Sequence, residues 1–84
     1  PHMGWNTLEN LSGPLFQDLN EKDFVYFVHS YYVPVTPYTT ATTNYIVPFS
    51  ASLQKDNFFA TQFHPEKSGS IGERILQNFI DLKL

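Results

Sequence analysis

The sequence predicts an α/β fold that consists mainly of β-strands and ends in one helix. A run of aromatic and β-branched residues from 24 to 33 is typical of a buried strand, and shorter runs of the same kind follow it between turn residues. From residue 70 onward, apolar residues recur instead at helical spacing. At 84 residues, the chain is one small domain or a piece of a larger one.

The first third of the chain predicts short elements. Residues 5–11 form a strand or an extended lead-in, and Ser12-Gly13-Pro14 interrupts it. One helical turn over 15–19 and a polar turn over 20–22 follow. Both faces of the predicted strand 24–33 are apolar, so we expect it to be covered on both sides. Its polar interruption, at residues 29 and 30, lies near the end of the strand, where an active site could begin.

The remaining elements are three strands and a helix. Residues 34–43, with two prolines and five threonines, read as a loop. Strands are predicted over 42–46, 48–54 and 58–63, with a hairpin turn over 55–57. Ser70 and Glu73 have the spacing of a helix capping box. The helix that follows should cover one sheet face with a wide apolar stripe of Ile71, Ile75, Leu76, Phe79 and Ile80.

Composition excludes several classes of protein. Five basic residues against eight acidic ones, a net charge of −3, argue against a nucleic-acid partner. No apolar run approaches the ~20 residues that span a membrane, and the first residues do not resemble a signal peptide. Without cysteine there is neither a disulfide nor a thiolate metal site. The simplest expectation is a soluble cytoplasmic protein with no membrane partner, and no cofactor is expected either.

The segment Phe63-His64-Pro65-Glu66 is the first candidate for chemistry. A strand brings the imidazole to its end, and the proline then directs the backbone into a turn that can return the carboxylate of Glu66 to His64. A carboxylate on one ring nitrogen sets the tautomer, which leaves the other nitrogen free to deprotonate a nucleophile. The alternative is a turn whose two polar side chains are simply solvated, and spacing alone favours that alternative.

His29-Ser30-Tyr31 is the second candidate. Adjacent residues of a strand point to opposite faces, so direct activation of Ser30 by His29 is not expected. Two interpretations stay open at this point, a substrate-binding rim and a polar pair satisfied at the end of a strand. A metal site built from the three histidines, at 2, 29 and 64, is weakly supported because no carboxylate or cysteine accompanies them at ligand spacing.

Three motifs in fixed order resemble those of class I glutamine amidotransferases. They are Pro-His-Met-Gly-Trp-Asn at 1–6, Tyr-Phe-Val-His-Ser-Tyr at 26–31 and Ala-Thr-Gln-Phe-His-Pro-Glu-Lys-Ser at 60–68. The first motif and the end of the third point, within this family, to the glutaminase subunits of imidazole glycerol phosphate synthase. Residues 1–6 disfavour another class I glutaminase, such as the anthranilate synthase subunit.

This resemblance implies a three-layer, flavodoxin-like domain and a Cys-His-Glu triad that hydrolyses glutamine. His64 matches the general base and acid, and Glu66 matches the residue that orients it. Ser30 and Tyr31 match positions that contact glutamine, largely through the backbone. The family implies no cofactor and no metal for this reaction.

The resemblance also implies a heterodimer that serves histidine biosynthesis. The ammonia passes to a cyclase subunit, the (β/α)8 barrel HisF. His2, Trp5 and Asn6 resemble residues that face this partner, whereas Tyr26 and Lys67 resemble residues near the mouth of the ammonia passage.

The chain departs from the family pattern because it contains no cysteine. We therefore expect residues 1–84 to be the C-terminal fragment of one amidotransferase domain, with the nucleophile upstream of Pro1, and to be inactive alone. The alternative is a non-catalytic interaction module that kept the sheet and lost the nucleophile.

Overall fold

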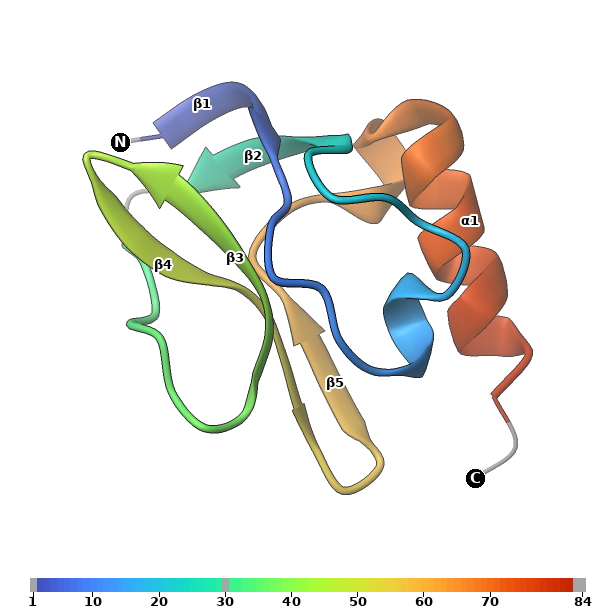
Figure 1. The fold of residues 1–84 in the computed structure, drawn as a ribbon. Coiled ribbons are helices and arrows are strands. Elements are labelled where there is room, and N and C mark those ends of the chain that lie inside the picture. The colour runs from blue at the N-terminus through green and yellow to red at the C-terminus, as the bar shows by residue number, and fades with distance from the viewer. Residues whose placement is uncertain (1, 30, 83–84) are drawn as a thin grey trace.

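The computed structural model describes residues 2–29 and 31–82 (Figure 1). Two β-sheets, both antiparallel, account for the strands. The first sheet pairs β1 (His2–Thr7) with β2 (Phe24–His29). The second has the order β3 (Thr39–Tyr45), β4 (Val47–Lys55), β5 (Phe58–Thr61). The helices are two short 3₁₀ turns, η1 (Pro14–Phe16) and η2 (Pro65–Lys67), and α1 (Gly69–Ile80).

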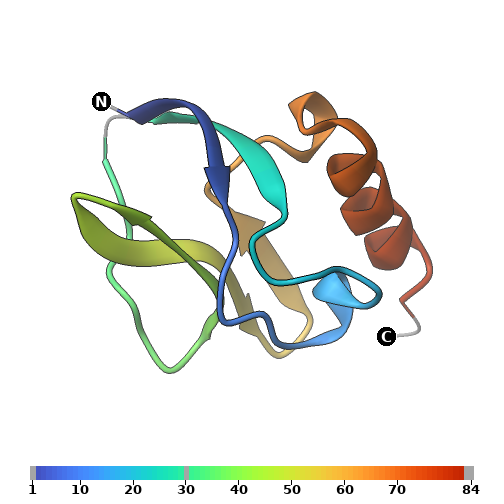
Figure 2. The same cartoon turned by 45° about the horizontal axis from the view of Figure 1, so that its top comes forward.

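The two sheets are joined through the residues that follow β5. Phe63 forms an isolated bridge with Phe27 of β2, and the next amide, His64 N, donates to Tyr26 O at 2.9 Å. Both views place α1 at one side of the molecule and the β3–β4 hairpin at the opposite side, with β2 between them (Figures 1 and 2). The residues that follow β5 therefore run between the two sheets.

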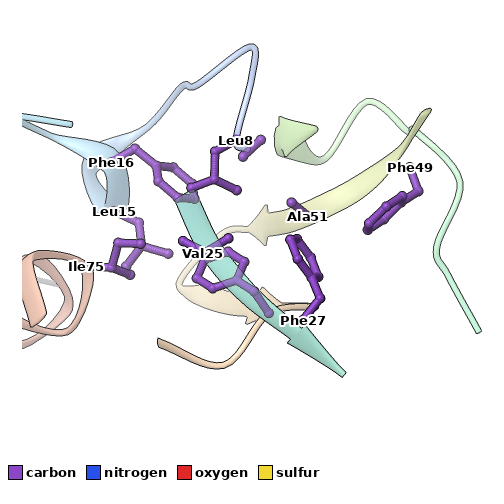
Figure 3. Packing of buried hydrophobic residues seen from close by; sticks show 10 residues of the cluster. Leu8, Leu15, Phe16, Val25, Phe27, Phe49, Ala51 and Ile75 are labelled. Atoms are coloured by element: carbon purple, nitrogen blue, oxygen red, sulfur yellow. The ribbon is translucent and has the colours of Figure 1, made fainter. Parts of the chain in front are cut away.

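Aromatic side chains form the centre of the core. Phe27 packs edge-to-face on Phe49 and Phe63, with ring centroids 5.6 and 6.0 Å apart, a geometry that aromatic pairs prefer. Figure 3 shows this cluster continuing toward α1 through Val25, Leu15 and Ile75. Because β2 supplies both Val25 and Phe27, it is the strand on which the core is organised.

The structure corrects the prediction for residues 24–33 in two ways. The strand ends at His29, and Val33 belongs to an isolated bridge with Ser50 instead. The strand is also covered on one face only, because Val25 and Phe27 are buried whereas Phe24 and Val28 are exposed. An apolar pattern on both faces therefore does not mean that both faces are covered within this chain.

Several predicted boundaries were also wrong. Strand β1 spans 2–7 rather than 5–11, and the helical turn begins at Pro14. β3 begins at Thr39, inside the predicted loop, because threonines after Pro37 pair with β4. The helix begins at Gly69 with Ser68 at its N-cap position, so Ser70 lies inside the helix and forms no capping box.

Helix α1 is attached to η1 by a buried polar side chain. Asn78 Nδ2 donates to Leu15 O at 3.0 Å and to Gln17 O at 2.8 Å. Of the predicted apolar stripe, Ile75 is buried, whereas Leu76, Phe79 and Ile80 are exposed. The helix therefore buries a narrower face than the sequence predicted, and a polar contact supplements it.

Replacing Asn78 by alanine is expected to lower the free energy of unfolding by roughly 1–2 kcal/mol, since two carbonyl oxygens lose their donor. Urea unfolding of the chain measures this change. Gln77→Ala is the matched control, because the hydrogen bond from Gln77 to Asp81 is exposed and its loss should matter little. Equal effects of the two substitutions would contradict the role given to Asn78.

Among the described residues, no helix is both long enough and apolar enough to cross a membrane.

Candidate active site

The predicted pair of His64 and Glu66 is formed. Nδ1 of His64 lies 3.2 Å from Oε2 of Glu66, and 38% of the His64 side chain and 60% of the Glu66 side chain are exposed. Buried Phe63 and the hydrogen bond from His64 N to Tyr26 O hold the backbone that carries the imidazole. Pro65 then begins η2, which turns the chain so that Glu66 returns to the ring.

The contact with Glu66 determines which nitrogen of His64 carries a proton. The backbone N–H of Glu66 itself, opposed by slight burial and assisted by the hydrogen bond from His64, holds the pKa of Glu66 below its ordinary value. Glu66 is therefore a carboxylate at neutral pH and can only accept a hydrogen bond, so Nδ1 of His64 carries the proton. The Nε2 of a neutral His64 is then the atom that can take a proton from a nucleophile.

Ser68 connects this turn to β2, a role that sequence reasoning missed. Its hydroxyl donates to His64 O at 2.6 Å and accepts from Tyr26 N at 2.9 Å, and Ser68 is buried. Together with the bond from His64 N to Tyr26 O, this gives the backbone of Tyr26 two links to the turn at residues 64–68, called the catalytic turn for the role proposed below. The position of Ser68 in the motif at 60–68 was the only indication in the sequence of a role, and no nearby residue indicated that its partner would be Tyr26.

Replacing Ser68 by alanine is expected to lower the free energy of unfolding by roughly 1–3 kcal/mol, because the N–H of Tyr26 loses its partner and His64 O keeps only the bond from Lys67 N. Urea unfolding of the chain measures the loss. Ser70→Ala, an exposed position two residues on, is the control and should change stability little. If both variants unfold at the same urea concentration, Ser68 does not hold the turn.

Helix α1 approaches the same turn closely at Gly72. A Cβ added at Gly72 would lie 1.8 Å from Pro65 O and 3.0 Å from the Cβ of Ser68. Only glycine therefore allows the first turn of the helix to pack on η2. The catalytic turn is held from two sides, by β2 and by α1.

A second group of predicted residues lies at the other end of β2. His2 faces His29 across the β1–β2 pair, with Nδ1 of His2 3.0 Å from Nε2 of His29. His29 Nδ1 lies 2.6 Å from Tyr31 O. These histidines form part of the wall of a pocket of about 200 Å³ that is lined further by Tyr32, Tyr45, Ile46, Val47 and Phe49. Ser30 lies outside the described residues.

The residues predicted to face a partner are distributed over both faces of β1. Trp5 is 54% exposed and packs edge-to-face on Tyr26, with ring centroids 5.7 Å apart. Asn6 donates to Asn44 O, and His2 is 5% exposed, so both lie on the inner face. Lys67 is exposed at the end of η2. The structure thus brings Trp5 close to Tyr26 and separates it from His2.

Within residues 2–29 and 31–82, no group of three or more histidine, aspartate or glutamate side chains is arranged to hold a metal ion. Two of the three histidines bond to each other, and the third bonds to Glu66.

Comparison with known proteins places this geometry in a family. Residues 1–82 match the family described as Glutamine amidotransferase class-I. The chain is 65% identical over 82 residues to a protein of Bacteroides thetaiotaomicron named Imidazole glycerol phosphate synthase subunit HisH, covering 98% of this chain and 42% of that protein. Proteins of the same name from Salmonella typhimurium and Colwellia psychrerythraea are 52% and 51% identical over 83 residues, covering 98% of this chain and 42% and 37% of their own lengths.

The chain thus spans about two fifths of the length of such relatives. The match over nearly all residues shows that the chain belongs to the class-I glutamine amidotransferase family.

Proposed function

We propose that this chain is the C-terminal part of the glutaminase subunit of imidazole glycerol phosphate synthase, which hydrolyses glutamine and supplies ammonia to a cyclase subunit. The observation that carries the proposal is the His64–Glu66 pair at the end of β5, in a chain that is 65% identical to a HisH subunit. The relatives are named HisH subunits, and this supports the choice of this glutaminase within the family.

In the proposed reaction, His64 serves a cysteine that these 84 residues do not contain. Because the relatives are more than twice as long, we place that cysteine on the remaining part of the subunit. His64 Nε2 takes the thiol proton while sulfur attacks the glutamine carboxamide, and the same proton then goes to the departing ammonia. Glu66 keeps the ring in the required tautomer and stabilises the imidazolium that forms between the two steps. The 84 residues alone are therefore expected to be inactive.

We place glutamine between the catalytic turn and the end of β2, where Ser30 and Tyr31 would contact it. Tyr26, which is hydrogen-bonded to the catalytic turn, lies three residues before His29 on the same strand. At the rise of an extended strand, Tyr26 and His29 are about 10 Å apart along β2. A glutamine molecule covers part of this distance. The catalytic turn, held beside the middle of β2, and the residues after β2 would thus bind opposite ends of one substrate.

The face of the β1–β2 sheet that points away from the core, called the outer face, has the character of a binding surface for a partner protein. Met3, Trp5, Phe24 and Val28 are all exposed on it, and such a contiguous apolar surface is typical of an interaction site. We assign to it the cyclase subunit HisF, with Trp5 as the accessible aromatic side chain and Lys67 near the passage for ammonia. The interface role predicted for His2 and Asn6 stays a proposal, although both side chains point inward from β1.

A chimera tests this function directly. In the HisH subunit of Bacteroides thetaiotaomicron, the 82 aligned residues are replaced by those of this chain, and the product is called the HisH chimera below. We expect it to release glutamate from glutamine and, with a cyclase subunit, to support cyclisation with glutamine as the nitrogen source. A folded chimera that hydrolyses no glutamine, beside an active parent protein, would disprove the proposal.

Replacing Lys67 by methionine in the chimera is expected to leave glutamate release within about threefold while lowering the share of ammonia that reaches the cyclase, since the charge lies beside the pair and not in it. Glutamate and cyclised product measured in the same reaction give this share. Lys55→Met is the control, because Lys55 lies at the end of β4, in the β4–β5 hairpin. An unchanged ratio of the two products would refute the role of Lys67.

A further inference from the structure

A chain of two hydrogen bonds links the inner face of β1 to the backbone of Tyr31. Because a carbonyl oxygen only accepts, the 2.6 Å contact with Tyr31 O requires the proton of His29 on Nδ1. In a neutral His29, Nε2 then carries a lone pair, so His2 Nδ1 must donate across the 3.0 Å contact. When both rings are neutral, the geometry therefore assigns them the same tautomer, protonated on Nδ1.

Packing and strand pairing hold the ring of His2 in place, so it can anchor this chain of hydrogen bonds. Its ring stacks on Tyr45 and on Phe27, with centroids 4.1 and 4.8 Å away and interplanar angles of 5° and 18°. The direct pairing of His2 with His29 across β1 and β2 sets the distance between the rings. Burial is the largest cause that lowers the pKa of His2, and it favours the neutral ring; a positive charge on His29 would lower this pKa further.

The position of the Tyr31 backbone depends on its hydrogen bond with His29. Its side chain is 87% exposed, so packing does little to fix residue 31. Two residues further on, Val33 O accepts from Ser50 N at 2.7 Å, which fixes the next point along the segment. Between the end of β2 and that point, the ring N–H of His29 determines where the Tyr31 carbonyl lies.

We propose that His2 is a positioning residue for the substrate, which acts through His29 to hold the Tyr31 backbone in the conformation that binds glutamine. The proposal rests on the proposed function, since Tyr31 is assigned to glutamine there. It gives His2 a role in the interior, different from the partner interface that the sequence predicted. A phenylalanine at position 2 could stack equally well on Phe27 and Tyr45, so the stack alone does not require a histidine.

Two substitutions in the HisH chimera separate the hydrogen bond from the stack. His2→Phe keeps an aromatic ring and removes the donor, and we expect it to raise the KM for glutamine about tenfold with little change in kcat. His2→Asn keeps an N–H where Nδ1 stands, and we expect it to recover most of the loss. An unchanged KM in His2→Phe, a fall in kcat alone, or no recovery with asparagine would overturn the proposal.

A second measurement decides whether the hydrogen-bond chain exists independently of activity. Long-range ¹H–¹⁵N NMR of histidine-labelled chimera should show His29 protonated on Nδ1 at neutral pH, with the Nε2 resonance shifted in His2→Phe. A His29 protonated on Nε2 alone would overturn the proposal. If the chimera hydrolyses no glutamine, the proposed function fails, and the tautomer still shows whether His2 and His29 are linked as inferred.

Discussion

Replacing His64 by asparagine in the HisH chimera is expected to lower the rate of glutamine hydrolysis by at least ~10²–10⁴-fold, the usual contribution of a general acid–base group. Asparagine keeps a polar group near the position of Nδ1, but it has no group at the position of Nε2 and cannot take up a proton at neutral pH. The Nε2 that the carboxylate of Glu66 leaves available would be lost, and with it the transfer from thiol to ammonia. Single-turnover release of glutamate measures the change.

Two variants that replace a glutamate by glutamine show whether activity depends on the carboxylate beside His64 or on the total negative charge. Glu66→Gln removes the carboxylate beside the imidazole, and we expect a smaller loss than in His64→Asn because the pair is largely exposed to solvent. Glu73→Gln removes an exposed carboxylate from α1 and should leave turnover unchanged. Intact turnover in His64→Asn would show that His64 is not the base, and a loss in Glu73→Gln as large as in Glu66→Gln would show that charge alone matters.

Replacing Gly72 by alanine is expected to destabilise the chain by about 2–3 kcal/mol, in spite of the higher helix propensity of alanine. The new Cβ would lie 1.8 Å from Pro65 O, a backbone atom that cannot rotate away. The first turn of α1 must then separate from η2, which displaces the backbone between His64 and Ser68. Urea unfolding of the chain measures stability, and glutamate release by the chimera measures the displacement.

Ser70→Ala is the control for this variant, since it adds no atom and lies in the same helical turn on the exposed side. We expect Gly72→Ala to lower glutamine hydrolysis as well as stability, because the carbonyl it displaces belongs to the catalytic turn. A variant at Gly72 that is as stable and as active as the parent would show that α1 does not support the site.

The pair of His64 and Glu66 could be predicted because its geometry is local. One proline separates the two residues, and the turn that begins at this proline lets them meet, although spacing alone favoured a solvated turn and the family motif was needed to choose between the two. Ser68 could not be found in this way, since its partner Tyr26 lies 42 residues away in the sequence. A serine before a helix is ordinary, and only the packing of β2 beside the turn gives its hydroxyl two partners.

The errors on β1 and β2 have a different cause. The apolar pattern of residues 24–33 does not tell which face is covered, and coverage depends on what packs there. The exposed face of Phe24 and Val28 is the one for which we propose a partner. His2 and Trp5 belong to the same motif, yet the alternation of a strand places them on opposite faces.

From residue types and order alone come the family, the strand-rich architecture with a C-terminal helix, and the proposal that His64 and Glu66 act together, because the order of the motifs carries them. The fold in three dimensions supplies the contacts on which the proposed roles depend: the two bonds of Ser68, the close approach at Gly72 and the link from His2 to Tyr31. Each of these joins residues from different elements. Such contacts depend on how the elements pack, and packing is a property of the whole chain that no local pattern contains.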